Sequence, residues 1–500
     1  MLKITITLAW LWAGFAARSQ APLRSVDSIL TTMAAHQLFN GSLLIAEEGR
    51  IVYERSFGYL DRTRHIPNSD TAVVNLASLS KPFTSLAVLQ LVQAGRVALD
   101  SPCFRYLPGF PYPTVKVRHL LTHTSGLPSL ERFYDDYIHE HPDELITNQS
   151  AYDRLLALRP ALLYTPGDQW GYNNFNYLVL ALLVQQVSGM RFADYMRAHV
   201  FLPAGMRSTY IREPAMPNNV RYFRPAMYFT DRVDVDSLGH GEYYTDYNLG
   251  GIQGPGNVMS TLRDLLRFDN ALRSGGLVDT ALLDTAFRAV LLNQGDTFHF
   301  PGSTRSYGMG WNVYHNKTAP FTRFAFHDGH ISGMMTFLNH TIDKNETIIC
   351  YDNMDNPPLS LMISVSNLLN GLPPRKMSLA FSLARLYGAT MAASGIDAAT
   401  AVFNEWRDDS AHYYVDELEL NRLGYDFLSA TMPHHLDYAL EVFKVNTLLF
   451  PHSGNTYDSY AQVLEKTGHR AEAIAMYRKS IQLWPGNEEG KKALERLLGN

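Results

Sequence analysis

Apolar stretches with β-strand character occur in two parts of the chain that are far apart, and a helical segment separates them. Residues 41–61 (GSLLIAEEGRIVYERSFGYLD) hold two runs rich in Ile, Val and Tyr, with a polar turn between them. Similar runs return at 307–315, 323–340 and 346–353. Residues 101–275 carry helical patterns punctuated by Gly, Pro and Asn. This order predicts an α+β domain in which distant segments complete one antiparallel sheet.

The N-terminus has the pattern of a secretory signal peptide over residues 1–19. Lys3 supplies a positive charge, residues 4–16 are mainly apolar, and Ala17-Arg18-Ser19 offers a cleavage site before Gln20. We therefore expect an exported protein, periplasmic or secreted. The later apolar run 177–184 is too short to cross a membrane and is expected to be a core helix, so no membrane span should remain after the signal is removed.

Length, charge and cysteine content narrow the class of protein further. A chain of 500 residues exceeds the usual single domain. The formal net charge of -5, with no run of Lys and Arg, argues against nucleic acid as a partner. Only Cys103 and Cys350 are present, so we expect isolated, buried thiols rather than a disulfide framework.

The chain changes character near residue 370 and is helical from there to its end. Residues 439–451 (ALEVFKVNTLLFP) and 473–485 (AIAMYRKSIQLWP) align at a spacing of 34, which resembles the period of the tetratricopeptide repeat. The predicted organisation is a signal peptide, a catalytic domain, a linker with helices and a repeat region, with the bounds 1–19, 20–370, 371–420 and 421–500. The repeats would bind a partner protein or a second copy of the chain.

Ser78 and Lys81 lie three residues apart in ASLSKPFT (77–84), directly before an apolar helical run. One interpretation is a helix N-cap followed by a surface charge. The other is a nucleophile and its activator, because a desolvated lysine beside a hydroxyl can accept its proton. The motif is too short to decide between them.

Three other stretches complete a candidate site. Tyr172 and Asn174 stand in a Y-x-N arrangement just before a helical run, and His327 and Gly329 form an H-x-G on a strand pattern. Residues 250–256 (GGIQGPG) form a glycine-rich loop that leads into a helix capped by Ser260 or Thr261. The loop lacks the G-K-[ST] of a phosphate-binding loop, and we expect it to line a cleft.

The order S-x-x-K, Y-x-N and a K-T-G-like strand motif resembles the penicillin-recognising serine hydrolases. The words HLLTHTSGLP (119–128) and PAGMRST (203–209) are similar to the group of class C β-lactamases, D-alanyl-D-alanine carboxypeptidases and esterases. The resemblance covers roughly residues 25 to 365. It implies a β-lactamase/transpeptidase-like fold, an antiparallel sheet plus a helical subdomain, and a serine hydrolase without a cofactor.

The resemblance also implies a role for each matching residue. Ser78 would become acylated, Lys81 and Tyr172 would share the proton transfers, and either of these two could be the base. Asn174 would bind the acyl side of the substrate and orient Lys81. The backbone N–H groups of Ser78 and His330 would bind the oxyanion, as such an anion requires two donors. Gly329 would let the substrate approach the strand.

The chain departs from the family where K-T-G would have lysine, because it has His327 there, followed by Asp328. An imidazole is mostly neutral at pH 7, so we expect a substrate carboxylate to be favoured only at mildly acidic pH. Efficient β-lactam hydrolysis is not expected. The substrate would be an ester or amide, peptide-like and including D-amino-acid or cell-wall-derived compounds.

Two alternatives remain open from the residues alone. His119 and His123 are spaced as zinc ligands on a helix, but the glutamate of H-E-x-x-H is missing, so we expect structural histidines and no metal site. The rival function is a weakly active penicillin-binding-like module that senses a peptide or cell-wall ligand, with its repeats bound to a partner protein.

Overall fold

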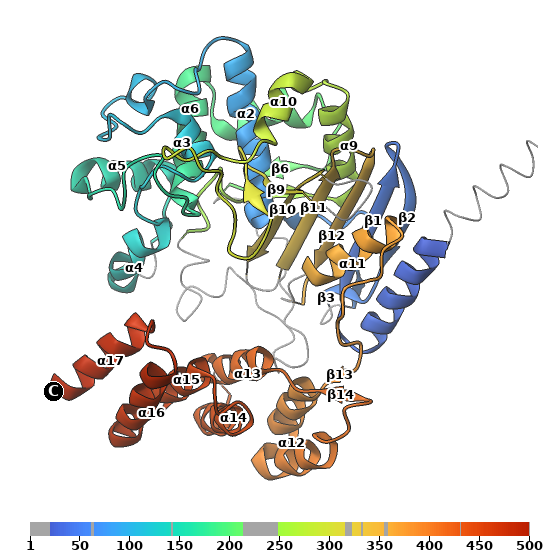
Figure 1. Ribbon diagram of the computed structural model, residues 1–500, viewed down its shortest axis with the longest axis vertical. Coiled ribbons are helices and arrows are strands. Elements are labelled where there is room, and N and C mark those ends of the chain that lie inside the picture. Colours follow the sequence, from blue (N-terminus) through green and yellow to red (C-terminus); the bar gives the residue numbers. More distant parts are fainter. Residues whose placement is uncertain are drawn as a thin grey trace, which may run out of the picture. The chain divides into compact units, whose positions relative to one another are not determined.

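In the computed structural model, the two ends of the first part of the chain meet in one antiparallel sheet (Figure 1). Strand β1 (Gly41–Glu47) pairs with β12 (Glu346–Asp352), with Gly41 opposite Asp352. The seven strands run in the order β2-β1-β12-β11-β10-β9-β8. The others are β2 (Arg50–Ser56), β8 (Ser306–Tyr307), β9 (Asn312–His315), β10 (Arg323–Ile331) and β11 (Met334–Thr341). The prediction that distant segments share a sheet is confirmed.

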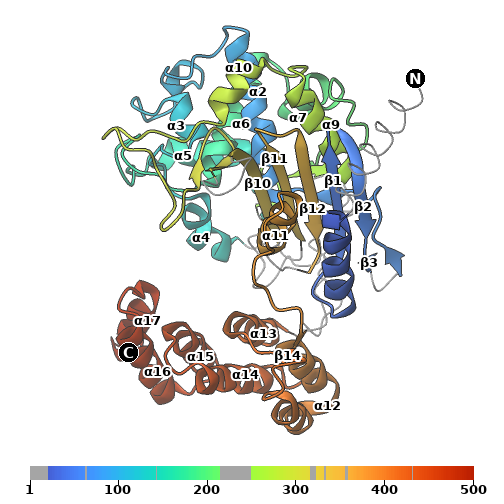
Figure 2. The same ribbon diagram turned by 45° about the vertical axis from the view of Figure 1, so that its right-hand side comes forward.

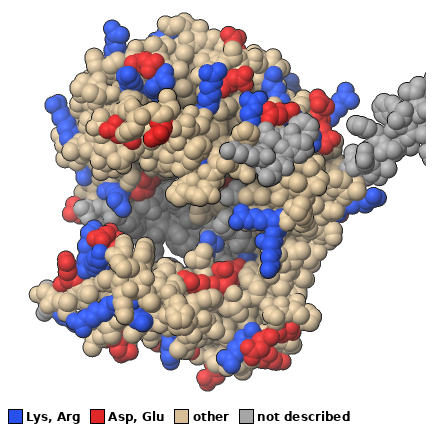
Figure 3. Space-filling model, in the orientation of Figure 1, with Lys and Arg blue, Asp and Glu red and all other residues tan. Residues whose placement is uncertain are grey.

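The structure describes residues 21–61, 65–141, 144–213, 249–315, 323–331, 334–354, 359–430 and 432–499. The predicted signal peptide lies outside these residues. Contacts divide the chain after Met377 into two units, the second of which also includes His36–Leu38. Within the described part, no helix is long and apolar enough to cross a membrane. On the face that Figure 3 shows, Lys and Arg are interspersed with Asp and Glu rather than gathered into one basic surface.

Both faces of the central sheet are covered, which explains why every residue of β11 and β12 is buried. Helical residues 21–35 and α11 (Leu359–Leu369) cover one face, where Leu30 and Met362 pack against Phe337 and Ile348. The opposite face carries Leu338 and Ile349 into the main core. Elements of that face, seen from a second side in Figure 2, include α2 (Lys81–Gln93) and α9 (Leu262–Arg273).

The helical subdomain is built around α2 and α6 (Asn174–Ser188), which pack against each other. Residues 175–184 of α6 are buried without interruption, so the apolar run predicted as a core helix is one. The remaining short elements of this unit are the 3-10 turns η1 (Ala77–Ser80) and η2 (Cys103–Arg105), the helices α3 (Val117–Leu121), α4 (Leu130–Glu140), α5 (Asn148–Leu158), α7 (Phe192–Met196), η3 (Arg197–Phe201) and α10 (Thr280–Ala286), and the strands β3 (Tyr59–Asp61), β4 (Ile66–Pro67), β5 (Val74–Asn75), β6 (Tyr210–Ile211) and β7 (Val258–Ser260).

A buried polar cluster fastens α9 to the sheet. The Asp269 carboxylate is fully buried and meets Nδ1 of His340 at 2.5 Å and Nε of Arg273 at 2.9 Å. Thr347 donates its hydroxyl to the same carboxylate. Burial opposes ionisation of Asp269, but its interactions with His340, Arg273 and Thr347 outweigh this effect and lower the pKa of the carboxyl. The cluster therefore holds a paired, hydrogen-bonded anion inside the domain.

The second unit is helical, as the sequence indicates. Its helices are α12 (Leu383–Trp406), α13 (Glu417–Ser429), α14 (His435–Leu449), α15 (Gly454–Lys466), α16 (Arg470–Leu483) and α17 (Glu488–Gly499), with a two-stranded pair β13 (Phe381–Ser382) and β14 (Tyr413–Tyr414). Ala439 and Ala473, which occupy matched positions of the repeat, are both fully buried. Consecutive helices from α13 to α17 pack against one another. The tetratricopeptide assignment itself stays a prediction.

Candidate active site

Ser78 is presented by a strained turn rather than by a regular helix. Ala77 has a φ of 47°, a left-handed conformation that costs an alanine about 1–2 kcal/mol. The side chain of Asn75 supports this turn by accepting the N–H of Ala77 at 2.8 Å. Helix α2 begins only at Lys81, and neither η1 nor α2 has a side-chain cap. The helix-capping interpretation of Ser78 is therefore wrong.

Lys81 is fully buried, and its amine points back to the turn. Nζ lies 2.9 Å from Oγ of Ser78 and 3.1 Å from the carbonyl oxygen of Pro255 in the glycine-rich loop. Burial lowers the pKa of Lys81 to about 7, although the charges of Glu131 and Asp328 oppose this effect. A large fraction of the amine is thus neutral at neutral pH and able to accept a proton.

Tyr172 lies beside this pair, directly before α6. Nζ of Lys81 is 4.7 Å from the centre of the Tyr172 ring, and the His123 ring packs 4.5 Å away. The ring is partly exposed. Its hydroxyl lies among buried groups, and this burial raises the pKa of Tyr172 well above its ordinary value, while a hydrogen bond with Ser78 lowers it less. The hydroxyl keeps its proton at neutral pH.

His327 does not behave as the sequence suggests. It is buried, its Nε2 lies 3.1 Å from the hydroxyl of Tyr307, and its Nδ1 lies 2.6 Å from the carbonyl oxygen of Asp328. Burial lowers the pKa of His327 to about 4, with Asp328 opposing and Lys81 adding to the effect. At this pKa most of the imidazole is neutral at pH 5.5 and above, so the structure does not support the cation expected at mildly acidic pH.

The structure shows a packing role for Gly329 that the sequence did not indicate. A Cβ at this position would lie 1.9 Å from the carbonyl oxygen of Leu76 and 2.5 Å from Oγ1 of Thr336. Thr336 donates to the same Leu76 oxygen at 2.8 Å. The glycine therefore lets the segment that leads to Ser78 approach β10. It does not line the cavities beside Ser78.

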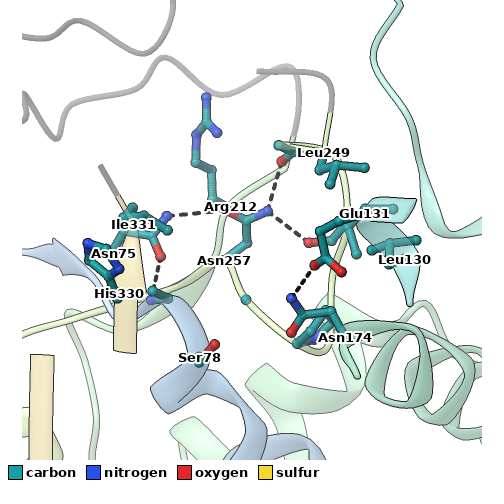
Figure 4. Close-up of a pocket in the computed structure, with 15 residues that line it drawn as sticks. Asn75, Ser78, Leu130, Glu131, Asn174, Arg212, Leu249, Asn257, His330 and Ile331 are labelled. Atoms are coloured by element: carbon teal, nitrogen blue, oxygen red, sulfur yellow. Dashed lines mark hydrogen bonds between the residues drawn. The ribbon is translucent and has the colours of Figure 1, made fainter. Parts of the chain in front are cut away.

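Two cavities meet at the Ser78 hydroxyl. The first has a volume of about 440 Å³ and contains Asn174, and the second has about 370 Å³ and contains Tyr172 and His327. Ser78 and His330 line both cavities, so the predicted nucleophile and the predicted oxyanion donor lie where they join. Figure 4 shows the first cavity, with Ser78 at its base.

The cavities contain residues that the sequence interpretation missed. The first includes Glu131, Arg212 and Asn257, and the second includes Trp170, Phe300, Arg305 and Tyr307. Nδ2 of Asn174 donates to Oε1 of Glu131 at 2.7 Å, so the amide expected to bind substrate has a protein partner. Three of them lie beside words that the sequence already offered: Glu131 follows HTSGLP, Trp170 stands two residues before Tyr172, and Asn257 directly follows the glycine-rich loop.

The predicted structural histidines accept backbone hydrogen bonds. Nδ1 of His119 accepts from Lys116 N at 3.2 Å, and Nδ1 of His123 accepts from Asn173 N at 3.2 Å. Among the described residues no three His, Cys, Asp or Glu side chains gather as metal ligands. Cys103 and Cys350 are free and buried, as predicted.

Comparisons with known proteins match the part of the chain that holds this site. A family model described as Beta-lactamase matches residues 26–377. Penicillin-binding protein 4* of Bacillus subtilis (strain 168) is 33% identical over 335 residues, 66% of this chain and 72% of that protein. Esterase EstB of Burkholderia gladioli is 36% identical over 188 residues, 34% of this chain and 46% of that protein.

Solved structures show the same fold. A penicillin-binding protein from Bacillus halodurans superposes with a TM-score of 0.58 at 22% identity, covering 68% of this chain and 99% of that one. D-amino acid amidase from Ochrobactrum anthropi SV3 gives a TM-score of 0.54 at 23% identity, covering 66% of this chain and 91% of that one. In both comparisons the match spans about two thirds of the chain.

Proposed function

The chain belongs to the β-lactamase family of serine hydrolases, and from this we propose that it cleaves an ester or amide through an acyl-enzyme at Ser78. The observation that carries the proposal is the 2.9 Å contact between Nζ of buried Lys81 and Oγ of Ser78. A neutral amine at this distance can remove the hydroxyl proton as the oxygen attacks a carbonyl carbon.

The two proton-transfer residues have separate tasks in this proposal. Lys81 is the base, because its pKa of about 7 leaves it substantially neutral at neutral pH. Tyr172 keeps its proton, since burial raises its pKa. When the tetrahedral intermediate collapses, the Tyr172 hydroxyl gives that proton to the leaving group and takes the one held by Lys81. Water then attacks the acyl-enzyme while neutral Lys81 accepts one of its protons, and this proton returns to Oγ of Ser78 when the second tetrahedral intermediate collapses and releases the acid.

The oxyanion would be bound where the two cavities join. The proposed donors are the backbone N–H groups of Ser78 and His330, which both line the cavities. The close packing of Gly329 against Leu76 supports this arrangement, because it fixes the strand that carries His330 against the turn that carries Ser78. Preorganised donors cost no reorganisation during the reaction.

The substrate is proposed to be peptide-like. The names of the relatives include a penicillin-binding protein, an esterase and a D-amino acid amidase, and these define the range of acyl donors to test. Efficient β-lactam hydrolysis is not proposed, because His327 replaces the family's lysine and is neutral. The signal-like residues 1–19 support export to the periplasm or the medium. The helical unit is proposed to bind a partner protein or a second copy.

The test is hydrolysis of 4-nitrophenyl butyrate by wild type, Ser78→Ala and a matched control, Ser80→Ala. Ser80 belongs to the same turn, and its Oγ accepts the N–H of Val258 at 3.1 Å rather than contacting Lys81. We expect Ser78→Ala to lose at least a thousandfold in kcat/KM and Ser80→Ala, once shown to be folded by circular dichroism, to keep most of it. Equal activity of folded Ser78→Ala and wild type would refute the proposal.

A further inference from the structure

The two cavities beside Ser78 divide the substrate between them. The proton donor to the leaving group, Tyr172, lines the 370 Å³ cavity, so the leaving group should occupy that side. The acyl part then lies in the 440 Å³ cavity, which contains Glu131 and Asn174. This division rests on the proposed function.

Glu131 is the charged residue of the acyl cavity that contacts Asn174. Glu131 lies in the first turn of α4, which is fixed by the Ser129 N-cap accepting the N–H of Arg132 at 3.2 Å. Nδ2 of Asn174 holds Oε1 of Glu131 at 2.7 Å. The Asn174 amide thus anchors one carboxylate oxygen of Glu131 to the start of α6, in the cavity that both residues line (Figure 4).

Among the residues that the structure describes, the Glu131 carboxylate has Asn174 as a partner and no cation. Within the described part of the chain, Glu131 makes no ion pair at 4 Å or less. Its negative charge is close enough to Lys81 to raise the pKa of that amine, against the larger effect of burial. Arg212 also lines the cavity, but its side chain points away from Ser78 in Figure 4, whereas the Glu131 carboxylate faces Asn174. The acyl cavity therefore presents an anion close to the nucleophile.

We propose that Glu131, positioned by Asn174, binds a protonated amine on the acyl side of the substrate. The preferred substrates would then be amides or esters of amino acids or peptides with a free amino group near the scissile carbonyl. A carboxylate accepts hydrogen bonds only, and an ammonium supplies charge and three donors together. An isosteric methyl group would supply neither.

The experiment compares alanine 4-nitroanilide, as both enantiomers, with isobutyric acid 4-nitroanilide. The second compound has a methyl group in place of the ammonium. Both substrates use the same Lys81 and the same leaving group, so the ratio of their kcat/KM values at pH 7 isolates recognition of the amine. We expect the better alanine enantiomer to be favoured at least fivefold by wild type and the ratio to fall toward one in Glu131→Gln.

The matched control is Glu140→Gln, at the end of the same helix α4 and outside the cavity, which should keep the wild-type ratio. A wild-type ratio near one, or a ratio unchanged in Glu131→Gln, would overturn the inference. Failure to cleave either anilide while 4-nitrophenyl isobutyrate is hydrolysed at Ser78 would also overturn it, with the serine hydrolase function intact. No reaction of Ser78 with any of these compounds would overturn both.

Discussion

His327 and Tyr307 are hydrogen-bonded to each other, with 3.1 Å between Nε2 of the imidazole and the phenol oxygen. This contact directs Nε2 of the buried imidazole to a buried tyrosine hydroxyl. The cation of the leaving-group cavity is instead Arg305, which stacks 3.8 Å from the centre of the Phe300 ring. Among the described residues Arg305 makes no ion pair, although Asp328 lies in the same cavity.

A first prediction concerns this cation. Two substrates would be compared that differ only in the leaving group, which is 4-aminobenzoate in one and 4-aminobenzamide in the other. The ratio of their kcat/KM values should favour the carboxylate and should not change between pH 5.5 and 8. A half-buried guanidinium should favour the carboxylate about three- to tenfold. Arg305→Gln should abolish the preference and Arg305→Lys should keep part of it. A preference that grows as the pH falls would instead assign the recognition to His327.

The pH dependence of the reaction should report Lys81. Burial places the pKa of Lys81 at about 7, and only the neutral amine can act as a base. For a neutral ester, kcat/KM should therefore rise about tenfold per pH unit below 7 and level off above it. Tyr172→Phe should lower the plateau without moving the midpoint. A midpoint near 10, the range of an ordinary lysine or tyrosine, would contradict the assignment.

Gly329→Ala should damage both stability and activity. The new Cβ would meet backbone oxygen of Leu76 at 1.9 Å, so the segment before Ser78 must move. Overpacking of this kind costs about 1–3 kcal/mol, which thermal unfolding would detect. Gly276→Ala, where the nearest atom is an ordinary 3.4 Å away, is the matched control and should unfold at nearly the wild-type temperature. Equal melting temperatures for the two variants would contradict the prediction, because they would mean that the Leu76 backbone moves away from the new Cβ without cost.

Asp269→Ala should be among the more destabilising substitutions in the catalytic unit. It leaves the buried charge of Arg273 and the His340 ring without their partner, which costs about 3–5 kcal/mol for a buried pair. Because the folded-state pKa of Asp269 is lowered, its contribution is present above the unfolded-state value near 4 and is lost as the pH falls below it. Urea unfolding at pH 7 and pH 3 would measure this loss. An equally large loss in the free energy of unfolding from Asp284→Ala, at an exposed position, would contradict this prediction.

The sequence predicts the parts of this site that are local. The spacing of Ser78 and Lys81 and the position of Tyr172 before a helix are visible in short motifs, and β-strand patterns at both ends of the domain predict the shared sheet. The N-cap of α9 is Thr261, one of the two predicted caps, whose side chain accepts the N–H of Asp264.

What the sequence could not reveal depends on contacts between distant segments. The burial of His327 against Tyr307 and the packing of Gly329 on Leu76 each join residues from different elements. Glu131 and Arg305 carry no motif, because an isolated charge in a loop or first helical turn is usually a solvated surface group. Their placement beside Ser78 follows from the fold alone.

The central claim is that Ser78 forms a covalent acyl-enzyme. The most direct measurement is mass spectrometry of the protein after rapid quenching with a 4-nitrophenyl ester, followed by mapping of the modified peptide. We predict a mass increase equal to one acyl group, located on Ser78, which grows when Tyr172→Phe slows later steps and is absent from Ser78→Ala. An acyl group on another residue, or steady turnover by Ser78→Ala, would contradict the account.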